Sequence, residues 1–351
     1  MKVSKRVLVI ATSSNTRGGI TAVIKAHQES NFWEEWNCIW IETHIDKYYL
    51  MKIFYFIKSF IKYLYLIKKT SLIHCHLSGP VSVIRKLPFL LIAKLMDIPI
   101  IIHFHAFSSK SNISKNYIKF YSVVFDMAEK IIVLSENWKD GILKDFKYDT
   151  NKVKVIYNPC PNVLPKMIKE CAKYILYAGT LNERKGYKDL IKAFSKIAYN
   201  YPDWKLVFAG NGEIENGKVL AKKYKIYSQV VFKGWVFADE KQKIFNDASI
   251  FCLPSYAEGF PMAVLDAWAY GLPVISTPVG GIPDVAVHGE NMLLFKPGNI
   301  LCLENNLRLL IEDEIIQKKL VKASKEFSTG KFSISSISKD LNRLYNDLLK
   351  I

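Results

Sequence analysis

The sequence is poor in acidic residues, in cysteine and in long uncharged runs. Its 351 residues include 32 Asp and Glu against 49 Lys and Arg, a net charge of +17. The six cysteines have no close spacing of the kind used by zinc or redox sites. We therefore expect free, reduced thiols of the kind found in the cytoplasm.

Membrane-spanning and export segments are also missing from the pattern. The longest stretch without Asp, Glu, Lys or Arg is 267–283, and it holds three Gly and three Pro. A spanning helix needs about 20 apolar residues without such breaks. The apolar run that follows Lys2, Lys5 and Arg6 ends at Ala11, too short for a signal peptide. We expect neither an export signal nor a membrane crossing.

The excess of basic residues favours anionic partners, such as nucleotides, nucleic acid or an acidic membrane surface. Residues 1–163 carry 23 basic and 12 acidic side chains, and the remainder carries 26 and 20. No basic and aromatic motif typical of nucleic-acid recognition accompanies this charge, so we expect no nucleic-acid partner.

Short apolar segments alternate with helix-like segments along the whole chain, which predicts two parallel sheets covered on both faces. Three prolines in 158–165 predict a linker between two Rossmann-like domains. The boundaries are 1–163, 164–330 and a C-terminal helix, 331–351, that returns to the first domain. The predicted strands are 6–11, 38–42, 72–76, 99–104, 131–134 and 153–156, then 174–179, 205–210, 230–233, 249–253, 273–276 and 292–295.

A basic amphipathic helix is predicted over 51–69. Its apolar residues recur at three- and four-residue steps and are expected to pack on the sheet, with the lysines outward against an anionic lipid surface. A helix that merely covers its sheet with a solvated lysine face is an equal alternative. The apolar set is Ile53, Phe56, Ile57, Phe60, Leu64 and Ile67; the outward set is Lys47, Lys58, Lys62 and Lys69, with tyrosines 48, 49, 55, 63 and 65 at the polar boundary.

A string that begins after the strand 249–253 carries the strongest chemical signal. Glu258 precedes a helix that Pro261 can open, and Asp266 lies within that helix. Gly259 allows close approach of a ligand to the backbone. Because the string follows a strand of a parallel sheet, it lies at the carboxyl edge, where such sheets bind ligands. Two carboxylates there can accept hydrogen bonds from sugar hydroxyls.

With these residues in view, the chain resembles the retaining glycosyltransferases of family 4, which have the GT-B fold, α/β with two Rossmann-like domains facing a cleft. The resemblance covers nearly the whole chain and keeps the family's order. It rests on the segments 18–20, 73–79, 102–107, 157–159, 178–186, 209–212, 232–234 and 253–284.

The resemblance implies roles for the matching residues. Lys185 and Arg184 would neutralise the nucleotide diphosphate, Gly18 and Gly19 would bring amides to the phosphates, and His105 would contact the sugar or phosphate at the reaction centre. Glu258 and the amides of Gly259, Phe260 and Met262 beside Pro261 would hold the sugar, and Asp266 the ribose. The catalytic set is thus His105 and Glu258.

Two positions depart from the family's pattern. Asp266 stands where a glutamate is usual, and Thr180 where many members have arginine. An Asp-X-Asp cluster that could hold a divalent metal is absent from the sequence, so we expect no metal and no cofactor.

The resemblance thus implies a retaining, metal-independent transferase (EC class 2.4) that uses a nucleotide-sugar, with UDP favoured over GDP on family grounds. The implied acceptor is a glycan on a polyprenyl diphosphate or a growing surface polysaccharide, such as capsule or lipopolysaccharide, and the implied location is the cytoplasmic face of the cell membrane. The alternative is a non-catalytic protein of the same fold that binds a nucleotide-sugar or glycan.

Overall fold

A computed structural model describes residues 5–105, 115–163 and 172–351, so Lys2, Ala106, Phe107, Cys171 and the linker residues 164 and 165 lie outside the described part. The chain forms two compact units. Unit 1 contains 1–159 and 334–351, and unit 2 contains 160–333. The unit boundaries therefore fall at 159/160 and 333/334, beside the predicted 163/164 and 330/331.

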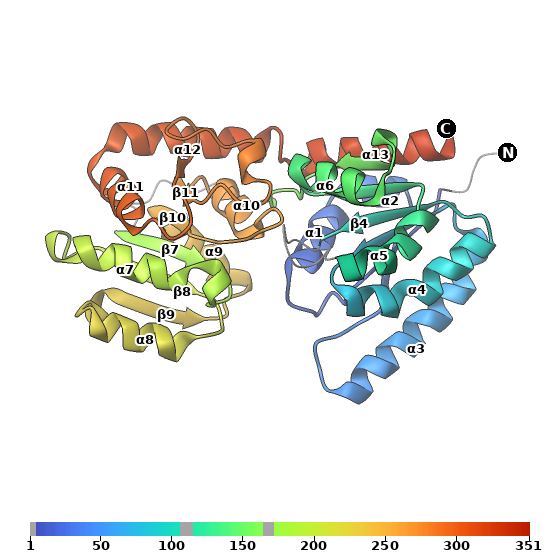
Figure 1. Cartoon of the computed structure of the whole chain (residues 1–351), viewed down its shortest axis with the longest axis horizontal. Helices are drawn as coiled ribbons and strands as arrows, with labels where there is room; N and C mark the ends of the chain where they lie inside the picture. The colour runs from blue at the N-terminus through green and yellow to red at the C-terminus, as the bar shows by residue number, and fades with distance from the viewer. Residues whose placement is uncertain (1–4, 106–114, 164–171) are drawn as a thin grey trace. The chain divides into compact units, whose positions relative to one another are not determined.

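Unit 1 is built around a parallel sheet with helices packed on it (Figure 1), and in the described residues the six strands have the order β2-β1-β3-β4-β5-β6. Alternate residues of β1 serve opposite faces: Leu8 and Ile10 join one apolar cluster, and Val7 and Val9 the other. Burial on both faces explains the continuous apolar strands. The strands are Val7–Ala11 (β1), Cys38–Glu42 (β2), Leu72–Leu77 (β3), Ile100–Phe104 (β4), Lys130–Val133 (β5) and Val153–Val155 (β6).

Helices cover both faces of this sheet, and the helix α13 comes from the far end of the chain. Ile337, Leu341 and Tyr345 of α13 are buried in the cluster that contains Trp36 and Trp40. The helices of unit 1 are Gly19–Gln28 (α1), Asn31–Glu35 (α2), Tyr49–Leu66 (α3), Pro80–Leu95 (α4), Lys115–Met127 (α5), Glu136–Phe146 (α6) and Ile334–Leu349 (α13).

Unit 2 contains a second parallel sheet of six described strands in the order β12-β11-β10-β7-β8-β9. Its strands are Tyr174–Ala178 (β7), Lys205–Ala209 (β8), Val230–Gly234 (β9), Ile250–Leu253 (β10), Val274–Ser276 (β11) and Leu293–Leu294 (β12). Its helices are Tyr187–Ile197 (α7), Ile214–Lys223 (α8), Ala238–Asp247 (α9), Met262–Ala269 (α10), Ile300–Glu312 (α11) and Glu314–Thr329 (α12), with a 3₁₀ turn, η3, at Glu183–Lys185. The α/β fold of two Rossmann-like sheets is confirmed.

The prediction for the basic helix is wrong about which side chains are covered. Phe56, Phe60 and Ile67 of the expected apolar set do face the sheet, but Ile53, Ile57 and Leu64 are exposed. Tyr63, expected at a polar boundary, is fully buried, and its hydroxyl donates to the Phe89 carbonyl at 2.5 Å. The rings of Phe56, Phe60 and Tyr63 all pack against Phe89 of α4. This aromatic contact with α4 decides which side of the helix is covered, because aromatic rings gain from edge-to-face packing with one another.

The cysteines of the described residues are free, and Cys38, Cys75, Cys160 and Cys252 are buried. Burial raises the pKa of the Cys75 thiol to about 11, so this thiol stays protonated at neutral pH. Among the described residues, no helix is both long enough and apolar enough to pass through a bilayer.

Candidate functional site

The strand order of unit 2 places two predicted site segments next to each other. Strand β7 pairs with β8 on one side and with β10 on the other, so the chain changes direction across the sheet between β7 and β10. Parallel sheets bind ligands outside the carboxyl ends of the strands at such a switch point. Lys185 follows β7 and Glu258 follows β10.

Lys185 and Glu258 are in direct contact at this point. The Lys185 Nζ lies 2.5 Å from Glu258 Oε1, and the Ser255 hydroxyl donates to the same oxygen at 2.6 Å. Arg184 lies 3.6 Å from Glu258 Oε2 and donates to the Ala257 carbonyl at 2.7 Å. The Glu258 side chain is only 6% exposed. Two cations therefore converge on one buried carboxylate, an arrangement in which an anionic ligand can compete for the cations.

Close backbone contacts hold these segments in place. The amide of Gly281 donates to the Gly259 carbonyl at 2.7 Å. A Cβ on Gly280 would lie 2.1 Å from that carbonyl oxygen, and Gly280 also has a φ of 62°. Gly186, directly after Lys185, would place a Cβ 2.0 Å from the Pro254 carbonyl oxygen. Glycine is required at both positions because the backbones touch.

The predicted residues 259–262 lie at the start of α10. Pro261 is the N-cap residue, Met262 begins the helix, and Gly259 and Phe260 lead into it. Phe260 is buried, and its ring packs against Trp268 and Phe332. This aromatic cluster fixes the path of the segment, so its amides keep a defined position.

Asp266 lies inside α10 and has a different cation from Glu258. Its Oδ1 is 2.7 Å from the Nζ of Lys241 in α9, and the residue is buried. The structure thus places both predicted carboxylates in unit 2 but pairs each with its own basic side chain.

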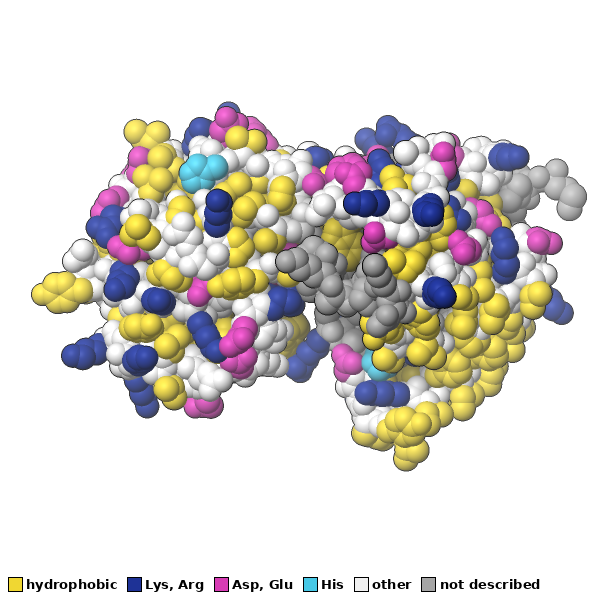
Figure 2. Space-filling view, in the orientation of Figure 1, with side chains coloured by type: hydrophobic (Ala, Val, Ile, Leu, Met, Phe, Trp, Pro, Cys, Tyr) yellow, Lys and Arg dark blue, Asp and Glu magenta, His cyan; other side chains and the backbone are white. Residues whose placement is uncertain are grey.

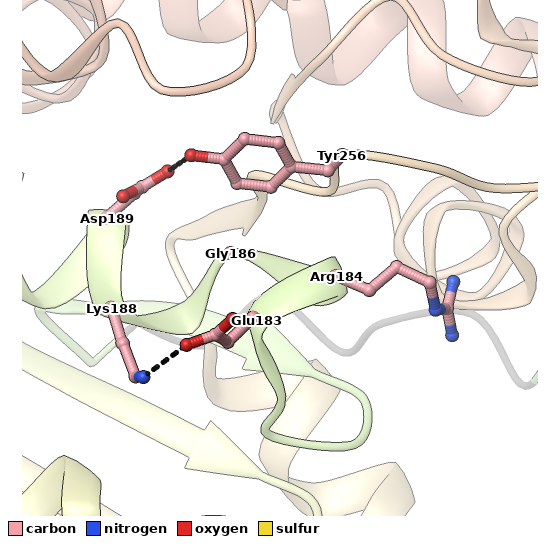
Figure 3. Close-up of a pocket in the computed structure, with 6 residues that line it drawn as sticks. All are labelled: Glu183, Arg184, Gly186, Lys188, Asp189 and Tyr256. Carbon is pink, nitrogen blue, oxygen red and sulfur yellow. Dashed lines mark hydrogen bonds and ion pairs between the residues drawn. The ribbon is translucent and has the colours of Figure 1, made fainter.

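A surface pocket of about 390 Å³ adjoins these residues (Figure 3). Figure 3 shows Tyr256 pointing to Asp189, with a hydroxyl-to-carboxylate distance of 2.7 Å, while Arg184 is directed away from that pair. Lys188 pairs with the exposed Glu183 at 2.9 Å. Neither Lys185 nor Glu258 lines this pocket, so it lies beside the paired charges rather than on them.

The predicted residues of unit 1 lie at the corresponding edge of its own sheet. β1 pairs with β2 on one side and β3 on the other, so its switch point lies between β1 and β3. Gly18 is the N-cap of α1 with a φ of 146°, and Gly19 is the first residue of that helix. A Cβ on Gly18 would meet nothing within 4 Å, so the backbone angle, not space, requires glycine there.

His105 follows β4 and is the outer member of a stack of four histidines on β3 and β4. His105 Nε2 is 2.8 Å from His76 Nδ1, and His74 Nε2 is 3.3 Å from His103 Nδ1. The Tyr345 hydroxyl of α13 lies 2.5 Å from His74 Nδ1. Burial lowers the pKa of His105 and of His74 to about 3, so these rings are neutral at physiological pH.

Nitrogen atoms of His74, His76 and His103 lie within 4.8 Å of one another, the separation of a potential metal-ligand group. However, neighbouring rings are stacked, with interplanar angles of 12° for His74 and His76 and 27° for His76 and His103. Ligand lone pairs lie in the plane of an imidazole ring, and stacked rings do not direct them to one point. The hydrogen bond between His76 and His105 instead lets the stack fix the orientation of the His105 ring.

Several contributing residues were not foreseen. Ser255 lies three residues before Glu258 in the segment 253–284, and this short spacing is a sequence signal for a contact between the two side chains. His76 lies in the segment 73–79, on which the resemblance rests, although the resemblance gives it no role. Lys241 and Tyr345 have no such signal, because each meets its partner only through the folded chain.

Two parallel Rossmann-like sheets, with basic residues and a carboxylate at the switch point of the second, are the features of the GT-B fold class. Family models bear this out. The model described as Glycosyltransferase Family 4 matches residues 15–161, and that described as Glycosyl transferases group 1 matches residues 165–327. The chain belongs to this glycosyltransferase family.

Relatives and solved structures agree. An uncharacterized glycosyltransferase of Methanocaldococcus jannaschii is 30% identical over 285 residues, 79% of this chain and 76% of that protein. One from Haemophilus influenzae is 36% identical over 189 residues, and the capsular polysaccharide biosynthesis glycosyltransferase CapM of Staphylococcus aureus is 27% identical over 227. These two matches cover 53% and 63% of this chain and about half of each relative, 52% and 56%.

The crystal structure of Anabaena HepE in complex with UDP and glucose has a TM-score of 0.79 at 14% identity, covering 98% of this chain and all of that one. At this identity the likeness concerns the fold alone.

Proposed function

We propose that this glycosyltransferase is a retaining, metal-independent enzyme that moves a sugar from a UDP-sugar to a lipid-linked or growing surface-polysaccharide glycan. The observation that carries the proposal is the contact of Lys185 and Arg184 with buried Glu258 at the β7/β10 switch point. The relative CapM, named for capsular polysaccharide biosynthesis, supports the class of acceptor, and the UDP in the HepE complex supports the donor.

In this proposal the donor replaces the internal ion pair. The diphosphate binds to Lys185 and Arg184. These two side chains stabilise the negative charge that grows as the bond between the sugar and the phosphate breaks. Glu258, still fixed by Ser255, then accepts hydrogen bonds from the sugar hydroxyls. Asp266 separates from Lys241 and accepts hydrogen bonds from the ribose hydroxyls. Gly18 and Gly19 donate backbone amide hydrogen bonds to the phosphates, and His105 contacts the sugar.

The chemistry requires no metal ion in this proposal. Two cationic side chains stand where a metal would otherwise neutralise the diphosphate. The proposed place of work is the cytoplasmic face of the membrane, where a polyprenyl-diphosphate-linked acceptor would be found.

The test is a panel of UDP- and GDP-sugars screened with the full chain by shift in melting temperature, followed by transfer to a polyprenyl-diphosphate-linked glycan with and without a chelator. We expect a UDP-sugar to bind, transfer to survive chelation, and the product to keep the donor's anomeric configuration.

Glu258→Ala should abolish transfer, whereas Glu183→Ala, which changes an exposed carboxylate of the adjoining pocket, should not. Near-normal turnover by Glu258→Ala would refute the donor-site assignment.

A further inference from the structure

The helices α3 and α4 each carry an apolar stripe on the side that does not face the core. On α4, Val81, Ile84, Leu91 and Leu95 are exposed at helical spacing. On α3 the exposed stripe includes Leu50, Ile53, Phe54, Ile57, Ile61, Leu64 and Tyr65. A helix of a globular protein normally has a polar outer face, so two neighbouring helices with apolar outer faces indicate a surface that contacts something apolar.

This apolar surface is concentrated in one part of the chain. Of the 26 large hydrophobic side chains that are exposed among the described residues, 14 lie between Tyr48 and Met96. Figure 2 shows them as a broad yellow area over α3 and α4. The two helices are neighbours, because the rings of Phe56 and Phe60 pack on Phe89. The stripes therefore form one surface, here called the α3/α4 surface.

The stretch that forms the α3/α4 surface carries charge of one sign, although the exposed Asp46 and Asp97 flank it and Lys94 pairs with Glu129 at 3.5 Å. From Lys47 to Met96 the sequence contains no Asp or Glu, and the exposed basic residues there are Lys47, Lys52, Lys58, Lys62, Lys68, Lys69 and Lys94. Lys58 and Lys62 are four residues apart on α3, so they lie side by side next to the apolar stripe. Apolar side chains bordered by lysines match the layers of an anionic bilayer, acyl chains below and phosphates above.

We infer that the α3/α4 surface docks on an anionic lipid bilayer, with the exposed side chains of α3 and α4 inserted below the headgroups and the lysines bound to lipid phosphates. A second copy of this chain is a poorer occupant, since two-fold packing would set lysines against lysines with no acid between residues 47 and 96. The inference rests on the proposed function only in that a lipid-linked acceptor makes such a surface useful.

The experiment is flotation of the full chain with vesicles of phosphatidylcholine alone or mixed with phosphatidylglycerol. We expect wild type to float with the mixed vesicles and to be released by salt. The double variant Ile57→Glu, Ile61→Glu should lose roughly tenfold or more in partitioning, because it removes inserted side chains and adds charge that the lipid repels. Lys58→Glu with Lys69→Glu should weaken binding to the mixed vesicles.

The matched control is Val219→Glu with Ile315→Glu, which changes two exposed apolar side chains of unit 2 and should leave flotation unchanged. Melting temperature and UDP binding should be unchanged in every variant, which separates failure of this inference from failure of the proposed function. Flotation that survives Ile57→Glu, Ile61→Glu overturns the inference. The inference is also overturned if wild type is a dimer that does not bind vesicles and the same double variant is a monomer.

Discussion

Lys185 contributes a charge that the fold has already partly removed from water. Its side chain is 14% exposed, and Glu258 is its ion-pair partner. In the proposed reaction the diphosphate replaces that partner, so Lys185→Ala should weaken nucleotide binding and slow transfer by about 2 to 4 kcal/mol. Calorimetric titration with UDP measures the first effect and steady-state kinetics the second.

Lys188→Ala is the matched control for this prediction, since Lys188 lies three residues further on, in α7, and pairs with exposed Glu183. Equal UDP affinities for wild type and Lys185→Ala would remove Lys185 from the donor site.

Lys86 is a lysine with no exposed surface, on the inner side of α4. Its ammonium donates to the His76 carbonyl and to the Ser82 hydroxyl, and burial lowers its pKa from 10.5 to about 8. Below pH 8 the group is charged in both the folded and the unfolded chain, so the free energy of unfolding is lowered by the full cost of burying the charge. Between pH 8 and 10.5 the unfolded chain holds the extra proton, so this contribution to stability rises with pH.

We therefore expect the stability of wild type relative to Lys86→Met to rise by about 3 kcal/mol from pH 7 to above pH 10. Denaturant unfolding of both proteins at several pH values measures it, and the comparison cancels the cysteine and tyrosine titrations that the two share. A difference that stays constant with pH would show that the Lys86 pKa is not lowered.

At the scale of elements, the strands and the segment 253–284 could be predicted from the sequence, whereas the orientation of α3 could not. All twelve predicted strands occur, with ends shifted by one residue at most. Their buried apolar residues make a local signal. The apolar residues of α3 instead surround most of the helix, and the packing of Phe89 from α4 decides which of them face inward. That information lies in a contact between elements, not in the period of one helix.

The same limit applies to the site. Glu258 and Lys185 could be proposed from their local motifs, but the pairing of Asp266 with Lys241 joins α10 to α9 and has no sequence pattern of its own.

The loop after β11, which contains Gly280, is expected to hold the segment 258–259 in place by backbone contact. Gly280→Ala would push a methyl group against the Gly259 and Glu258 carbonyls at an unfavourable φ. We expect a loss of about 2 to 4 kcal/mol in stability, together with reduced transfer.

Gly289→Ala separates the two causes, because Gly289 has a φ of 76° but open space around its Cβ position. It should cost about 1 kcal/mol, from the backbone angle alone. Thermal unfolding compares the two variants, and equal losses would contradict a role for the Gly259 contact.

At the scale of the whole molecule, α13 completes unit 1. Ile337, Leu341, Leu344 and Tyr345 are buried against its sheet. Burying four such side chains is worth about 6 to 12 kcal/mol, comparable to the entire stability of a typical domain. Removing residues 334–351 should therefore unfold unit 1 and leave unit 2 folded.

Limited proteolysis with mass spectrometry measures this outcome. Peptides from unit 1 should appear early, and those from unit 2 late. Removal of Lys350 and Ile351 alone is the control and should change nothing. Equal resistance of unit 1 with and without α13 would contradict the expectation.

The path of the chain has a consequence for its synthesis on the ribosome. Unit 2 is a continuous insertion between the two parts of unit 1, which are 1–159 and 334–351. During translation, unit 2 can fold as soon as residue 333 has emerged, while the first 159 residues still lack the helix that covers one face of their sheet. Unit 1 therefore closes after unit 2, although its synthesis begins first. A nascent chain stalled before α13 would lack the packing of Tyr345 on Phe32 and Trp36, so it would expose these two apolar rings until α13 has emerged.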